Sequence, residues 1–178
     1  MRAARPAPGY RKDTAAGGCP LGSPTMIIAV GVDHAGAILH EAVTGTLVEQ
    51  GHVVLDLGQC DDYPDMALAV GKAIESGEAE RGILICGSGA GIGVAASKIP
   101  GIYAQTVHDT YTAHQAVEHD DLNVLCMGGR VIGSEVAKEI VTAFAAAQVS
   151  EEERHVRRRA KVELIAAEGL AADLEGVS

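Results

Sequence analysis

The stretch ILICGSGAGIG, residues 83–93, joins an apolar run to a cysteine and then to a loop with glycine at every second position. The apolar run is typical of a buried strand, and the glycines would let backbone N–H groups face a ligand at close range. The spacing matches neither the GxGxxG dinucleotide motif nor the GxxxxGK(S/T) phosphate loop. We therefore expect a strand, a phosphate- or oxyanion-binding turn and a helix.

Cys86 stands between that strand and the glycine loop. A thiolate close to a helix N-terminus is stabilised, and a thiolate facing N–H donors combines a base with an oxyanion hole. Such a pair suits removal of a proton next to a carbonyl group. The alternative is that Cys86 is a small buried apolar residue that ends a strand, and the residues alone leave both interpretations open.

The rest of the chain alternates short apolar runs with helical patterns. Strands are predicted at 26–31, 52–58, 82–87, 101–107 and 123–128, and helices at 35–50, 65–77, 90–98, 109–120, 133–148 and 151–167. Asp65 and Asp109 are the expected N-caps of their helices. The alternation predicts an α/β fold with three layers (α-β-α) and a five-stranded parallel sheet, Rossmann-like or flavodoxin-like. The last, charged helix has no partner in such a domain, which favours a role in dimerisation.

Composition narrows the possible functions. The chain has 178 residues, a net charge of −10 and 3% aromatic residues, so we expect one domain with an aliphatic core and no nucleic-acid or membrane-surface partner. Four cysteines without CxxC spacing indicate free thiols and hence a cytoplasmic protein.

Residues 1–25 are predicted to be a disordered extension, with a transit peptide or sequence upstream of a start at Met26 as alternatives. The folded domain is expected at 26–168 and a flexible tail at 169–178.

Polar and reactive residues follow each predicted strand, where ligands of such sheets bind. They are Asp33 and His34, Asp62 and Tyr63, Cys86 with residues 87–91, His108 and Asp109, and Gly128 to Arg130. No metal site is expected, because the histidines lack HxxxH spacing and the adjacent pairs Asp61–Asp62 and Asp120–Asp121 point in different directions.

Several charged residues have two interpretations. His119 at a helix C-terminus could simply stabilise that helix, and His40 and His52 are expected on the surface. The arginines in RHVRRRAK, residues 154–161, could form a solvated helix face or a phosphate-binding patch.

Six blocks of sequence occur in an order that resembles a known family. They are GVDHAG (31–36), DYPDMA (62–67), ILICGSGAGIGVAASK (83–98), HDTYTA (108–113), NVLCMGGRVIG (123–133) and ERHVRRR (153–159). From about residue 26 to 165 the chain resembles the ribose-5-phosphate isomerase B family, which includes the galactose-6-phosphate isomerase subunits.

The resemblance implies an aldose–ketose isomerase that acts on a phosphorylated sugar without a metal or other cofactor. It also implies a homodimer, or a tetramer in some members, with active sites at the subunit boundary. Cys86 would be the base that moves a proton between C1 and C2 through a cis-enediolate, and His119 would help to open the furanose ring. The enediolate oxygens would be bound by the loop of Gly87, Ser88, Gly89, Ala90 and Gly91, in which Ser88 fills the hydroxyl position.

The same resemblance implies the substrate-binding residues. Asp33, His34 and Tyr63 would line the sugar site, and Arg130, Arg154 and Arg158 would bind the phosphate. Asp120 departs from the usual Asn, and Ile92 leaves no carboxylate nearby, so the thiol is the only candidate base. We expect interconversion of ribose 5-phosphate and ribulose 5-phosphate. Two alternatives stay open. The substrate could instead be galactose 6-phosphate, allose 6-phosphate or erythrulose 4-phosphate, or the protein could be a non-catalytic sugar-phosphate binding module.

Overall fold

The computed structural model describes residues 24–177. Most of the predicted N-terminal extension, with Cys19, lies outside the described residues. Within them the strands are β1 (Ile27–Asp33), β2 (Val53–Cys60), β3 (Arg81–Cys86), β4 (Ala104–Thr106) and β5 (Val124–Gly128). The α-helices are α1 (His40–Glu49), α2 (Tyr63–Glu75), α3 (Ala90–Ala96), α4 (Thr110–Asp120), α5 (Ser134–Ala146) and α6 (Glu153–Glu168). Two short 3-10 helices, η1 (Ala37–Leu39) and η2 (Gly169–Ala171), precede α1 and follow α6.

The five strands form one parallel sheet in the order β2-β1-β3-β5-β4. The α/β prediction is therefore confirmed. The order differs from the flavodoxin order 2-1-3-4-5 only in that the last two strands are exchanged. The chain reverses its direction of travel across the sheet between β1 and β3, and such a switch point leaves a crevice beyond the carboxyl ends of the strands.

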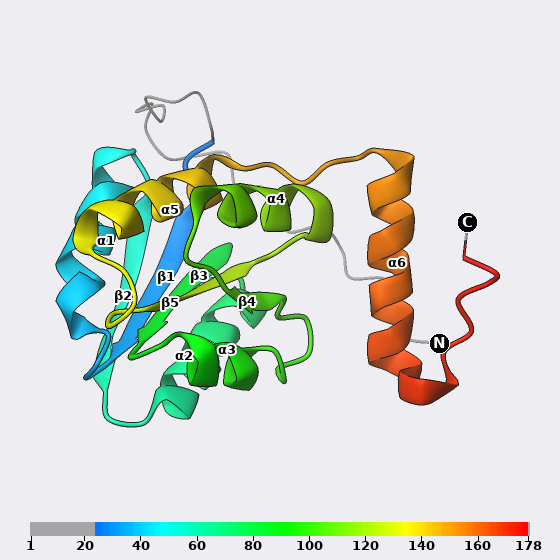
Figure 1. The fold of residues 1–178 in the computed structure, drawn as a ribbon, viewed down its shortest axis with the longest axis horizontal. Helices are drawn as coiled ribbons and strands as arrows, with labels where there is room; N and C mark the ends of the chain where they lie inside the picture. Colours follow the sequence, from blue (N-terminus) through cyan, green and yellow to red (C-terminus); the bar gives the residue numbers. More distant parts are fainter. Residues whose placement is uncertain (1–23, 178) are drawn as a thin grey trace.

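Helices cover both faces of the sheet (Figure 1). The core on one face joins the strands to α1, α4 and α5 through Leu47, Val117 and Phe144. The core on the other face joins them to α2 and α3 through Val70 and Ile92. Strands β3 and β5 are buried along their whole length, which explains their uninterrupted apolar sequence.

Three local predictions were wrong. Helix α2 begins at Tyr63 with Asp62 at its N-cap, not with Asp65, because Pro64 is well suited to the first turn of a helix. Strand β4 is only three residues long, because the chain turns at Gly101, whose φ is +79°, and becomes extended only after that turn. His52 is buried, where its Nδ1 accepts a hydrogen bond from the backbone N–H of Met26 across 3.3 Å.

Helix α6 projects from one end of the sheet and stands apart from the α/β body (Figure 1). Of its side chains only His155 is buried. Arg159 links α6 to α4 and to the segment before α6, because it donates hydrogen bonds to the carbonyl oxygens of His119 at 3.3 Å and Ser150 at 2.9 Å. Val162 and Ile165 are each about half exposed, so the apolar side of α6 is largely uncovered. Within residues 24–177, none of the helices has the length and apolar character needed to cross a membrane.

Candidate active site

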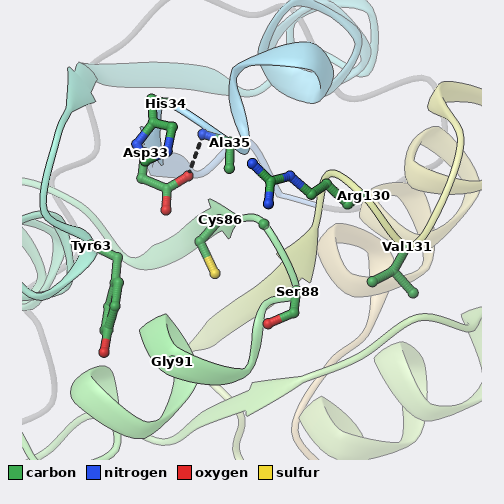
Figure 2. Close-up of a pocket in the computed structure, with 10 residues that line it drawn as sticks. Asp33, His34, Ala35, Tyr63, Cys86, Ser88, Gly91, Arg130 and Val131 are labelled. Carbon is green, nitrogen blue, oxygen red and sulfur yellow. Dashed lines mark hydrogen bonds between the residues drawn. The ribbon is translucent and has the colours of Figure 1, made fainter.

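A cavity of about 420 Å³ opens at the switch point, beyond the carboxyl ends of β1 and β3. Ten residues line it: Asp33, His34, Ala35, Tyr63, Cys86, Gly87, Ser88, Gly91, Arg130 and Val131. In Figure 2 the Cys86 sulfur lies between Tyr63 and Ser88, and Arg130 reaches over from the turn that follows β5. Parallel strands end at one edge of the sheet, and this brings residues together that are up to about a hundred positions apart in sequence.

The cysteine loop holds the sulfur next to an amide donor. The Cys86 side chain is only 4% exposed but lines the cavity, and its Sγ accepts a hydrogen bond from the backbone N–H of Gly89 across 3.1 Å. Gly89 has a φ of +79°, a left-handed conformation that favours glycine. The loop thus turns back on itself, and an amide points at the sulfur.

The turn after β1 is fixed by a buried carboxylate. Asp33 is 5% exposed, and its Oδ1 accepts hydrogen bonds from the backbone N–H groups of Ala35 at 2.8 Å and Gly36 at 2.9 Å. These bonds close the chain over the end of the strand and leave the exposed His34 at the rim of the cavity.

The turn after β5 supplies the positive charge of the cavity. It continues alongside the cysteine loop, because the N–H of Gly129 donates to the Cys86 carbonyl at 2.8 Å and that of Arg130 donates to the Gly87 carbonyl at 3.0 Å. The Arg130 side chain passes close to Gly87: a Cβ added to Gly87 would lie 3.8 Å from the Arg130 Nε. A guanidinium group at this place suits a bidentate contact with an anion.

Six predicted site residues do not line this cavity within one chain. Gly89 and Ala90 belong to the loop that carries Cys86 but do not line the cavity themselves, whereas His119, Asp120, Arg154 and Arg158 lie elsewhere. The helices of parallel β-α-β units run opposite to the strands, so the end of α4 returns to the amino edge of the sheet. Asp120 there lines a second cavity of about 520 Å³ between β4 and α6. Arg154 is exposed on α6 and pairs with Glu152 at 2.8 Å. Arg158, on the same helix, is exposed too.

His119 packs against a second histidine. Its ring centroid lies 4.0 Å from that of His155, with the two planes inclined by 31°. Burial and the neighbouring His119 lower the pKa of His155. The pair joins α4 to α6, so His119 does more than stabilise a helix end.

The other described cysteines have different surroundings. Burial raises the pKa of the Cys126 thiol to about 12, and the neighbouring Cys86 adds to this shift. Burial also raises the pKa of Cys60, at the end of β2. All three described cysteines are free thiols, but among them only Cys86 lines the cavity.

Sequence reasoning missed two kinds of residue. Ala35 and Val131 line the cavity as neighbours of predicted residues. Thr106 and His108, at the end of β4, form hydrogen bonds to the two loops that carry Cys86 and Arg130. Thr106 fell inside the strand predicted at 101–107, and His108 was expected after that strand but without a role in holding the loops. Within residues 24–177 no group of three or more His, Cys, Asp or Glu residues is arranged to hold a metal ion.

A doubly wound parallel sheet with a thiol, amide donors and a guanidinium at its switch point has the architecture of an α/β enzyme. The chain belongs to the ribose/galactose isomerase family, whose model matches residues 28–162, and it is an enzyme of the isomerase class.

Known relatives resemble most of the described chain. Ribose-5-phosphate isomerase B of Escherichia coli (strain K12) is 45% identical over 135 residues, which are 74% of this chain and 90% of that protein. D-erythrulose-4-phosphate isomerase of Pectobacterium atrosepticum is 40% identical over 128 residues, which are 69% of this chain and 84% of that protein. A solved structure of ribose-5-phosphate isomerase B from Clostridium thermocellum has a TM-score of 0.75 and 40% identity, and the match covers 80% of this chain and 98% of that one.

Proposed function

We propose that this protein interconverts ribose 5-phosphate and ribulose 5-phosphate. The observation that carries the proposal is the place of Cys86, whose sulfur faces a cavity and accepts the N–H of Gly89 at 3.1 Å. A relative 45% identical is a ribose-5-phosphate isomerase B. The cavity volume lies within the range of small-molecule sites.

In the proposed reaction Cys86 acts as a thiolate base. It takes the proton from C2 of the open-chain aldose, so the C2–H bond breaks, an S–H bond forms and the electron pair moves into a cis-enediolate. Backbone N–H groups of the loop at 87–91 would stabilise the negative oxygens. The thiol then returns the proton to C1, and a proton moves between the two oxygens, so the ketose forms with no change in composition. Ser88 at the mouth of the loop would assist this second transfer.

The remaining predicted residues fit a site completed by a second copy of the chain. Arg130 is present in the cavity, whereas His119, Asp120, Arg154 and Arg158 lie elsewhere in the same chain. Helix α6 projects with Val162 and Ile165 half exposed, as expected for a helix that packs on a partner. We propose a homodimer in which α6 and the end of α4 bring the ring-opening His119 and the phosphate-binding arginines to the partner's cavity.

A second candidate substrate is erythrulose 4-phosphate. Two relatives named as D-erythrulose-4-phosphate isomerases are each 40% identical, over 128 and 121 residues. Asp120 stands where the resemblance predicts Asn, and a carboxylate accepts but does not donate hydrogen bonds. The reaction would be the same, and only the length of the sugar would differ.

We further propose that the enzyme works in the cytoplasm. Cys60, Cys86 and Cys126 are free thiols, and a thiol base persists best in a reducing compartment.

The test is a panel of phosphosugars assayed at one enzyme concentration in deuterated water. Ribose 5-phosphate, erythrulose 4-phosphate, allose 6-phosphate and galactose 6-phosphate are each followed by NMR for product and for deuterium at C1 or C2. The proposal predicts the highest kcat/KM with ribose 5-phosphate and deuterium in its product. A higher value for another sugar would replace the substrate but keep the chemistry. Binding without product or deuterium would make the protein a sugar-phosphate binding module and overturn the proposal.

A further inference from the structure

Two hydrogen bonds link the short edge strand β4 and the residues just after it to the loops that carry Cys86 and Arg130. Strand β4 pairs only with β5 and contributes no residue to the lining of the cavity. Its last residue, Thr106, and His108 two positions later each bond to a different loop of the site.

Thr106 holds the cysteine loop. Its hydroxyl donates to the carbonyl oxygen of Gly89 across 2.8 Å, and the N–H of that same glycine donates to the Cys86 sulfur. The methyl group of Thr106 also fills the space beside Gly89, where an added Cβ would lie 2.7 Å from it. The same carbonyl oxygen also accepts the N–H of Gly93 across 3.0 Å, so Gly89 is held from α3 by Gly93 and from the sheet by Thr106.

His108 holds the arginine turn. Its Nε2 accepts the backbone N–H of Gly128 across 3.0 Å, at the point where β5 ends and the turn to Arg130 begins. An acceptor role requires an Nε2 without a proton. Gly128 lies directly against the backbone of Ser88, so a shift of this turn would move both loops.

We propose that Thr106 and His108 together form a clamp, called here the β4 clamp, that positions the Cys86 sulfur and the Arg130 guanidinium. Neither residue is catalytic, since each acts through a backbone group of a loop. Thr106 keeps the Gly89 N–H directed at the Cys86 sulfur. His108 fixes the position of the turn at Gly128 that leads to Arg130. The inference rests on the proposed function for the roles of Cys86 and Arg130, but the two bonds can be tested without turnover.

Thr106 is tested by alkylation of Cys86 with iodoacetamide at neutral pH, followed peptide by peptide by mass spectrometry. Thr106→Val keeps the shape and loses the donor, whereas Thr106→Ser keeps the donor. One lost hydrogen bond predicts alkylation about three- to tenfold slower in the Val variant, with the Ser variant within about twofold of wild type. A wild-type rate in Thr106→Val would overturn the role of Thr106. If the Val variant does not fold, Thr106→Ser decides, since a slowed rate with the hydroxyl present would contradict the clamp.

His108 is tested by the protection that inorganic phosphate gives to Cys86. His108→Leu removes the acceptor, whereas His108→Gln places a carbonyl oxygen close to the position of Nε2. The phosphate concentration that halves alkylation should rise about three- to tenfold in the Leu variant and return toward wild type in the Gln variant. Equal values in wild type and His108→Leu, or no protection of the wild type, would overturn the role of His108.

Turnover then separates the two halves of the clamp. Thr106→Val should lower kcat with little change in KM, and His108→Leu should mainly raise KM. A purely structural role would change both parameters in both variants. Failure of the wild type to turn over any phosphosugar would sink the proposed function and leave the alkylation results to decide the clamp.

Discussion

The backbone N–H of Gly89 donates a hydrogen bond to the sulfur of Cys86 across 3.1 Å, within a loop that follows a fully buried strand. The bond joins the residue that would carry the negative charge before proton transfer to the loop that would stabilise the enediolate oxygens afterwards. An amide fixed in advance needs no reorganisation during the reaction, and this preorganisation is the main source of electrostatic catalysis.

Replacement of Cys86 by Ala is expected to lower kcat by at least about a hundredfold, because a positioned proton-transfer group contributes roughly 10²–10⁴. The control is Cys126→Ala, since burial and the nearby Cys86 raise the pKa of Cys126 to about 12 and it does not line the cavity. The measurement is steady-state turnover of ribose 5-phosphate, with retained binding checked by calorimetry. Full activity in Cys86→Ala would remove the thiol from the mechanism.

Gly89→Ala should impair both stability and turnover. Its φ is +79°, and an added Cβ would lie 2.9 Å from the Met127 carbonyl carbon as well as 2.7 Å from Thr106. The left-handed conformation alone costs an alanine about 1–2 kcal/mol, and the backbone contact adds to that cost. The matched control is Gly101→Ala, which has the same φ of +79° but no atom within 4 Å of the added Cβ.

Thermal unfolding and kcat of both glycine variants are the measurements. We expect the control to lose stability only and Gly89→Ala to lose kcat as well. Equal kcat values in the two variants would show that the position of the cysteine loop does not matter.

The fold and one half of the site could be predicted because both depend on local patterns. Buried parallel strands are continuous apolar runs, and their carboxyl ends meet at one edge, so Asp33, Cys86 and Arg130 were expected together. The short β4, the two bonds of the β4 clamp and the burial of His52 depend on which segments meet across the fold. Hydrophobic periodicity does not predict such contacts, because a buried polar residue and an exposed one have the same effect on the sequence pattern.

Acid should weaken the fold partly through His52. Burial is the largest cause that lowers the pKa of this side chain, and the neighbouring Arg81 lowers it further while Glu80 opposes the shift. Because the folded pKa lies below the unfolded value of about 6.5, the unfolded chain binds more protons as the pH falls. The contribution of His52 is therefore complete above pH ~6.5 and is lost as the pH falls through the folded pKa.

The midpoint of urea unfolding, measured from pH 8 to pH 5, checks this prediction. His52→Gln should show a smaller loss of stability on acidification than wild type. His114→Gln, at an exposed histidine of α4, is the control and should follow the wild type. Parallel curves for wild type and His52→Gln would contradict the assignment.

A mixture of two inactive variants should regain activity if each cavity is completed by the partner subunit. Cys86→Ala lacks the base but keeps its arginines, and the double variant Arg154→Ala, Arg158→Ala keeps the base. In a heterodimer of the two, one cavity combines an intact Cys86 with intact arginines, and the other lacks both. Random exchange makes half of the dimers heterodimers, so about a quarter of wild-type activity should return at low substrate concentration. The assay is turnover after the variants are mixed, unfolded together and refolded. No recovery, with heterodimers confirmed by mass, would place the arginines and the thiol in the same subunit's site or remove α6 from the site altogether.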